Sequence, residues 1–158
     1  MKSDHITREG WQVLDDEFKY LWKVKRPEIT RAVSFAAAQG DRSENGDYIY
    51  NKRLLREIDR RIRFLDKRLD QLKIVDYDPL QEGRVFFGAY VEVESESGEI
   101  SRFRIVGTDE TDASKNFISI NSPMAQSLIG KQVDDEVQVK LPKGNKTVFI
   151  NTIDYNPK

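Results

Sequence analysis

The chain has 158 residues, of which 38% are hydrophobic and 34% are charged, and its formal net charge is −1. This length suits one or two small domains, and the high charged fraction indicates an extensive solvated surface. The sequence contains no cysteine, which excludes disulfides, thiolate zinc sites and cysteine nucleophiles.

We expect no targeting signal in the first residues. Segment 1–5 lacks the apolar run of a signal peptide and no later stretch reaches membrane length, so we expect a cytoplasmic protein that does not engage a membrane. The single histidine, His5, lies in a terminus that we expect to be mobile and to offer it no partner. Histidine-dependent acid–base or triad catalysis is therefore a poor candidate.

A first helix is predicted from Thr7 to about Ala38. Thr7 can cap its N-terminus, and Pro27, which lacks a backbone donor, predicts a kink rather than an end. Apolar residues recur along the first part of this helix at spacings of 3, 4 and 3, namely Trp11, Leu14, Phe18 and Leu21.

An acidic pair, Asp41 and Glu44, lies in the turn 40–46 that follows this helix. The spacing fits a capping box, in which Asp41 caps a second helix and Glu44 reaches back to the Asp41 backbone N–H. Carboxylates are also ligands for Mg²⁺, an ion that often takes only one or two of them from a protein. The two interpretations are compatible, because a cap would hold the same carboxylates in place.

Two such carboxylates should bind Mg²⁺ only weakly by themselves. The positive end of a helix dipole opposes a cation, and phosphodiester cleavage by two metals requires ligands that this sequence does not supply elsewhere. We therefore predict that Asp41 and Glu44 act inside the active site of a partner, and that the chain is not an enzyme by itself.

The second helix carries the pattern of a coiled coil. Folding the chain back at residues 40–43 brings four apolar pairs opposite one another, which predicts an antiparallel hairpin. The predicted pairs are Trp11 with Leu72, Leu14 with Leu69, Phe18 with Leu65, and Leu21 with Ile62. The seam of the second helix alternates spacings of 3 and 4 through Tyr48, Asn51, Leu55, Ile58, Ile62, Leu65, Leu69 and Leu72.

A basic stripe follows the outer face of the second helix. Residues 52–68 contain eight basic and three acidic side chains. The simpler interpretation is a solvated face supported by Glu57 and Asp59; the functional one, which the bias favours, is contact with RNA phosphates. The stripe consists of Arg53, Arg56, Arg60, Arg63 and Lys67, flanked by Lys52, Arg61 and Arg68.

The apolar period changes to two after residue 83. Alternation from Val85 to Val93 and a turn at Ser97–Gly98 predict a sheet of mostly antiparallel strands, and Ser122–Pro123 begins a short helix that stops at Gly130. We therefore predict an α+β protein of two domains. A coiled-coil finger spans 1–78, a linker 79–83, and a compact domain 84–158.

Several motifs resemble those of the bacterial Gre transcript-cleavage factors, most closely of the GreB branch. The tip motif Gly40–Asn45 and the run Arg56–Arg61 are highly specific when they occur together. The others are Thr7–Gly10, Arg26–Thr30, Tyr50–Arg53, Gly83–Ala89 and Ile120–Ala125. Two positions depart from the expected pattern, with Gly46 in place of alanine and Asn121 in place of aspartate.

The resemblance implies a coiled-coil finger and a C-terminal domain similar to FK506-binding proteins. Such factors dock at the rim of the RNA polymerase secondary channel and pass the finger through it. Asp41 and Glu44 would then complete the coordination of Mg²⁺ that is shared with the polymerase and not held stably by the factor alone. Backtracked RNA is cut internally, which releases arrested complexes.

The resemblance also implies two binding surfaces, and we expect the factor to act as a monomer. The basic patch would hold the 3′ segment of backtracked RNA, and the loop Asn121–Ser122–Pro123 would dock on the polymerase. The patch consists of Lys52, Arg53, Arg56, Arg60 and Arg61.

Three alternatives remain open from the sequence. The chain could occupy the same channel without stimulating cleavage, although the acidic pair argues against this. It could be a peptidyl-prolyl isomerase, although no deep aromatic site is evident in residues 80–158. It could also bind nucleic acid independently, which predicts tight RNA affinity without polymerase.

Overall fold

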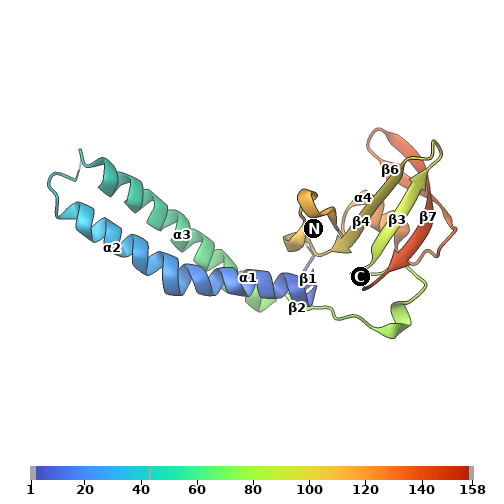
Figure 1. Cartoon of the computed structure of the whole chain (residues 1–158), viewed down its shortest axis with the longest axis horizontal. Helices are drawn as coiled ribbons and strands as arrows, with labels where there is room; N and C mark the ends of the chain where they lie inside the picture. Colours follow the sequence, from blue (N-terminus) through green and yellow to red (C-terminus); the bar gives the residue numbers. More distant parts are fainter. Residues whose placement is uncertain (1–2, 43, 157–158) are drawn as a thin grey trace. The chain divides into compact units, whose positions relative to one another are not determined.

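The computed structural model describes residues 3–42 and 44–156, which form two compact units (Figure 1). One unit, residues 11–72, is helical. The other combines residues up to 10 with those from 73 onward and contains the sheets. The predicted fold class, a helical hairpin plus a mainly antiparallel sheet with a short helix, is confirmed.

The helical unit is an antiparallel hairpin. Its first arm consists of α1 (Arg8–Tyr20), the π-helical segment η1 (Leu21–Lys25) and α2 (Arg26–Ala37), and its second arm is α3 (Gly46–Gln71). The Thr7 hydroxyl accepts a hydrogen bond from the Gly10 backbone N–H at 3.1 Å, which confirms Thr7 as the cap of α1. In the described part of the chain, none of the helices has the length and apolar character needed to cross a membrane.

At Pro27, where the sequence predicts a kink rather than an end, the helix does not end, and a π-helical segment lies shortly before the proline. Proline has no N–H, so the helix loses one ordinary hydrogen bond at this point. The Arg26 backbone N–H donates instead to the carbonyl of Leu21, which is the π-helical pattern. The first arm therefore continues into α2 with its backbone still helical.

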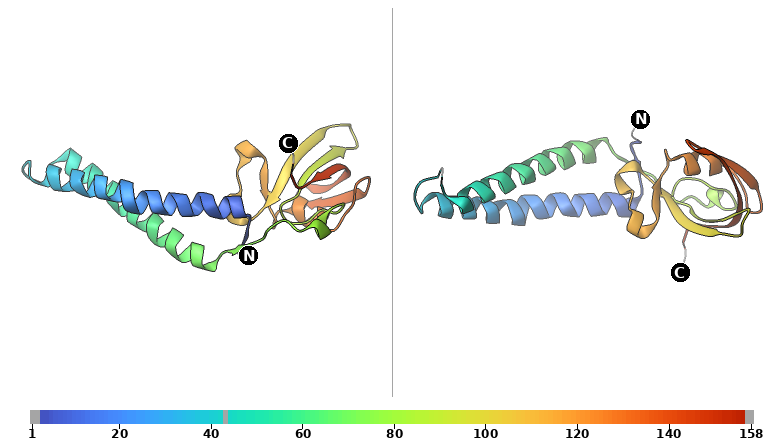
Figure 2. Two further views of the ribbon diagram at one scale, coloured as in Figure 1. Left: turned by 60° about the horizontal axis from the view of Figure 1, so that its bottom comes forward. Right: turned by 90° about the horizontal axis from the view of Figure 1, so that it is seen from above.

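An apolar seam joins the two arms. Ile29 of the first arm is buried with Ile58 and Ile62 of the second, and both Leu21 and Phe18 pack against this cluster. The cluster thus contains both members of one predicted pair, Leu21 and Ile62. The arms lie close together near the turn and separate toward their other ends (Figure 2).

Two ion pairs cross between the arms beside this seam. The Arg26 Nε lies 2.7 Å from an Asp59 carboxylate oxygen. Arg61 makes a bidentate pair with Glu17, with nitrogen–oxygen distances of 2.7 and 2.8 Å. Each pair requires one alignment of the arms, because the planar guanidinium matches a carboxylate only in a narrow geometry.

The sheet unit contains a five-stranded sheet of order β5-β4-β3-β7-β6. All neighbouring strands are antiparallel except β4 and β5, which are parallel. Helix α4 packs against β6. The elements are β3 (Tyr90–Ser95), β4 (Ile100–Val106), β5 (Phe117–Ser119), α4 (Pro123–Leu128), β6 (Glu136–Leu141) and β7 (Gly144–Asp154), with short 3₁₀ turns η2 (Pro79–Gln81), η3 (Thr108–Glu110) and η4 (Ala113–Lys115).

The first strand of this sheet begins later than the sequence alternation predicts. Val85, Ala89, Val91 and Val93 are buried, as the alternation requires, whereas Phe87 of the same alternating set is only half-buried. Strand β3 nevertheless starts at Tyr90, because Gly88 has a φ of 88°, a left-handed conformation that interrupts an extended strand.

The expectation of a mobile N-terminus around His5 is wrong. Residues His5–Ile6 form strand β1, which pairs in parallel with β2 (Lys73–Ile74), and the His5 ring meets the Phe87 ring edge-on. The Glu110 carboxylate accepts hydrogen bonds from the backbone N–H and the hydroxyl of Thr7. A strand of two residues leaves too short a pattern to be recognised in the sequence.

Tyr155 closes one end of the sheet core. The residue is 6% exposed, and its hydroxyl donates to the Arg84 carbonyl at 2.6 Å and accepts from the Phe86 N–H at 2.9 Å. Burial raises the pKa of this hydroxyl above its ordinary value. One hydroxyl therefore satisfies two backbone groups in the segment that precedes strand β3.

Replacing Tyr155 by phenylalanine is expected to lower the free energy of unfolding of the sheet unit by about 1–3 kcal/mol, because both backbone groups lose their partner. Urea unfolding monitored by tyrosine fluorescence measures this. Tyr77→Phe is the matched control, since its hydroxyl bonds Glu82 at the exposed surface; an equal loss in both variants would contradict the assignment.

Candidate functional site

The turn between the arms carries the acidic pair. Helix α2 ends at Ala37 and α3 begins at Gly46. Between them, Gly40 has a φ of 135°, a backbone conformation that strongly favours glycine. Asp41 and Glu44 are both exposed. They border a shallow, open hollow whose other lining residues are Gln39, Asn45, Gly46 and Asp47.

The capping box predicted at Asp41 and Glu44 is wrong, because the cap of α3 is Asn45. The Asn45 Oδ1 accepts the Tyr48 backbone N–H at 3.0 Å. Its Nδ2 donates across the turn to the Ala36 carbonyl at 2.6 Å. The sequence held a signal for this, since asparagine is among the preferred cap residues and precedes the helical pattern directly. Asp41 and Glu44 are consequently not committed to capping α3.

The chemistry of the turn fits a shared cation. Within residues 3–42 and 44–156, no group of three or more His, Cys, Asp or Glu side chains is arranged to hold a metal ion. Asp41 and Glu44 offer hard oxygen donors of the kind that Mg²⁺ takes, but too few to complete its shell. Such a pair can contribute ligands only where other oxygens are already assembled.

Gly46, the first residue of α3, has open space where a side chain would be. Gly46→Ala is expected to stabilise the helical unit by about 0.4–1 kcal/mol, because alanine restricts the unfolded chain more. Thermal unfolding followed by circular dichroism measures the gain. Gly40→Ala is the counterpart and should destabilise by about 1–3 kcal/mol because of its positive φ. A gain in both variants would exclude this explanation.

The basic stripe is exposed along most of its length. Every member of the predicted patch is exposed, and so are Arg63 and Lys67. Arg61 differs from the rest because Glu17 holds it across the arms. Arg68 is only 6% exposed, so it does not extend the stripe as the sequence suggested. The patch consists of Lys52, Arg53, Arg56, Arg60 and Arg61.

The predicted docking loop is a capped turn. The Ser122 hydroxyl accepts the Ala125 N–H at 3.2 Å, and Pro123 is the first residue of α4. The side chains of Asn121 and Pro123 are exposed on either side of the cap. The structure thus presents this loop on the surface with its backbone fixed by the helix it begins.

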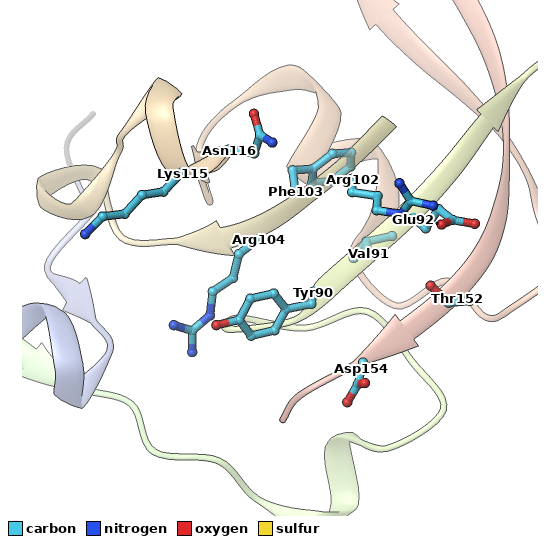
Figure 3. Close-up of a pocket in the computed structure, with 10 residues that line it drawn as sticks. All are labelled: Tyr90, Val91, Glu92, Arg102, Phe103, Arg104, Lys115, Asn116, Thr152 and Asp154. Atoms are coloured by element: carbon cyan, nitrogen blue, oxygen red, sulfur yellow. Dashed lines mark hydrogen bonds and ion pairs between the residues drawn. The ribbon is translucent and has the colours of Figure 1, made fainter. Parts of the chain in front are cut away.

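A hollow in the sheet unit is lined by residues of β3, β4 and β7, together with Lys115 of η4 and Asn116 (Figure 3). The Arg104 guanidinium lies 4.7 Å from the centre of the Tyr90 ring, and Arg102 pairs with Glu92 at 2.7 Å. The guanidinium thus lies within cation–π distance of Tyr90 inside this hollow.

Two family models match the chain in succession. The model described as "Transcription elongation factor, N-terminal" matches residues 5–74. The model described as "Transcription elongation factor, GreA/GreB, C-term" matches residues 80–155. Together they account for nearly the whole sequence.

Individual relatives are similar over nearly their full length. "Transcription elongation factor GreB" of Haemophilus ducreyi is 62% identical over 157 residues, which covers 99% of this chain and 97% of that protein. The protein of the same name from Yersinia pestis is 64% identical over 156 residues, covering 99% and 91%. Among solved structures, Thermus aquaticus Gfh1 is 23% identical, with a TM-score of 0.44 and coverage of 97% and 99%.

Proposed function

Because the chain belongs to the GreA/GreB family of transcription elongation factors, we propose that it stimulates Mg²⁺-dependent endonucleolytic cleavage of backtracked nascent RNA by RNA polymerase. In this proposal the hairpin enters the polymerase secondary channel, and the cleavage rescues arrested elongation complexes. The factor is not an enzyme by itself, since the polymerase supplies the rest of the active site.

The observation that carries the proposal is the exposed pair Asp41 and Glu44 at the turn of a narrow two-helix hairpin. Two helices side by side form a slender body, and a turn with exposed carboxylates can be inserted where a globular surface cannot. The pair has too few oxygens to hold Mg²⁺ alone, which suits ligands lent to an incomplete coordination shell.

Asp41 and Glu44 would hold the shared Mg²⁺ together with polymerase carboxylates and an RNA phosphate. When bound there, the ion supplies activation of the attacking water and charge neutralisation at the leaving oxygen. The residues of this chain contribute negative oxygens at a fixed place on the turn, without contributing the nucleophile or the proton acceptor.

The other two surfaces support the same proposal. The exposed basic patch lies on the arm that begins directly after the turn, where it would contact the phosphates of the 3′ RNA segment. The capped loop Asn121–Ser122–Pro123 would dock on the rim of the secondary channel. We further propose that one copy of the chain suffices.

The test uses stalled, backtracked elongation complexes with labelled RNA. Adding the protein and Mg²⁺ should yield shortened RNA that can be extended again when nucleotides are supplied. If the RNA stays intact although the protein competes for the secondary channel, the protein is a binding-only regulator. Cleavage of free RNA without polymerase would contradict the proposal in the other direction.

A further inference from the structure

We infer that Asn45 is a positioning residue for the acidic pair, acting by bonding the end of α2 to the start of α3. This inference rests on the proposed function, because it assigns a role in presenting Asp41 and Glu44. Asn45 itself need not touch the metal or the RNA.

The side-chain amide of Asn45 bonds two helix termini, donating to a carbonyl at the end of α2 and accepting from an N–H at the start of α3. At the end of α2, the Ala36 carbonyl is among the last four, which have no i+4 N–H partner inside the helix. It accepts the Gln39 backbone N–H at 3.0 Å, and its second lone pair remains available to a side-chain donor. At the start of α3, the Tyr48 N–H is one of the first that have no helical acceptor. The Asn45 Nδ2 and Oδ1 meet these groups at 2.6 and 3.0 Å respectively.

Only an amide of this length serves both groups. Serine can accept the Tyr48 N–H as a cap, but its hydroxyl is too short to reach Ala36 as well. Aspartate has acceptors only, so one of its oxygens would face the Ala36 carbonyl and repel it. The two partners also fix the orientation of the amide, since the reverse would place oxygen against oxygen.

The bond closes the turn around the acidic pair. Ala36 is 3% exposed and Asn45 is half-buried, so the Nδ2 contact is shielded from water. The Arg42 guanidinium also lies 5.5 Å from the centre of the Tyr48 ring, on the helix that Asn45 caps. The Asn45–Ala36 hydrogen bond thus joins the two ends of the segment that carries Asp41 and Glu44. Without this bond, Gly40 would allow the backbone of the segment many conformations.

The expected consequence is kinetic. When ligand placement loosens by about 1 Å, catalysis can fall by up to ~100-fold even though the partner still binds. Loss of the Asn45 bond to Ala36 should therefore reduce the maximal rate of cleavage and raise the Mg²⁺ concentration required. The factor concentration at half saturation should stay unchanged, because the docking surfaces lie elsewhere.

The experiment compares Asn45→Ser with Asn51→Ser in the full chain. Asn45→Ser keeps the cap, adds no charge and loses only the bond between the arms. Asn51→Ser removes the matched bond from Nδ2 to the Asp47 carbonyl, which lies within α3. Cleavage is measured against factor and Mg²⁺ concentration, and hydrogen exchange of the Gln39 amide, which bonds the Ala36 carbonyl, is measured without polymerase.

Asn45→Ser is expected to lower the maximal rate about tenfold and to accelerate Gln39 exchange by a similar factor, whereas Asn51→Ser should change neither. A maximal rate equal to that of the unaltered protein would overturn the inference while leaving the proposed function intact. If the unaltered protein gives no cleavage, the proposed function fails. Unchanged Gln39 exchange in Asn45→Ser would separately reject the bond as an anchor of the turn.

Discussion

Replacing both Asp41 and Glu44 by alanine is expected to abolish stimulated RNA cleavage while leaving binding to the polymerase intact. The residues are exposed, and neither caps α3, so their removal should not unfold the hairpin. Loss of groups that merely support metal ligands costs about 10–100-fold, so loss of two ligands should cost at least ~100-fold. Cleavage rates on backtracked complexes at saturating factor measure this.

The matched control is Glu57→Ala with Asp66→Ala. Both residues are exposed on α3, and their removal changes the net charge by the same amount without touching the turn. The double variant at the turn should still compete with the unaltered protein for elongation complexes. Equal cleavage by the Asp41/Glu44 variant and the unaltered protein would remove the acidic pair from the mechanism.

The second large effect is expected from Arg56→Ala combined with Arg60→Ala in the basic patch. Both side chains are exposed on α3 and would each neutralise one RNA phosphate. For single-stranded RNA, losing two contacts should reduce the slope of log affinity against log salt by about 1.4. The measurement is the half-saturating factor concentration on backtracked complexes at several salt concentrations.

Lys23→Ala with Arg31→Ala is the control for this experiment. These two cations are exposed on the first arm and carry the same total charge. The Arg56/Arg60 variant should lose affinity only where an extruded RNA 3′ segment is present, and should match the unaltered protein on complexes that have not backtracked. If both double variants lose affinity equally, general electrostatic attraction to the polymerase explains the effect better than RNA contact.

The hairpin could be predicted because its signal is long. The seam through Leu55, Ile58 and Ile62 repeats over many turns, and burial of these residues follows directly from the coiled-coil period. The cap of α1 at Thr7 and the short helix after Ser122 were also predictable, because each has a local chemical cause. In the second domain the alternation predicted most of the buried side chains correctly, but it did not predict where strand β3 begins.

Features set by distant contacts were not predictable. The sequence pattern Asp41-x-x-Glu44 matches a capping box, yet Asn45 is the residue that caps α3. Its side chain also bonds the Ala36 carbonyl on the other arm, a contact that the local sequence does not reveal. Strand β1 has only two residues and forms because β2, far along the chain, pairs with it. In the sequence Arg61 is indistinguishable from the other members of the basic face. In the folded hairpin it forms an ion pair with Glu17 of the other arm.

The ion pairs Arg26–Asp59 and Glu17–Arg61 fix the alignment of the two arms along the hairpin. Sliding one arm past the other by a single helical turn would move each pair apart by about 5.4 Å and break both. The number of residues between these pairs and the acidic turn therefore sets the distance from the pairs to Asp41 and Glu44. A descendant sequence could change that distance only by lengthening or shortening both arms together.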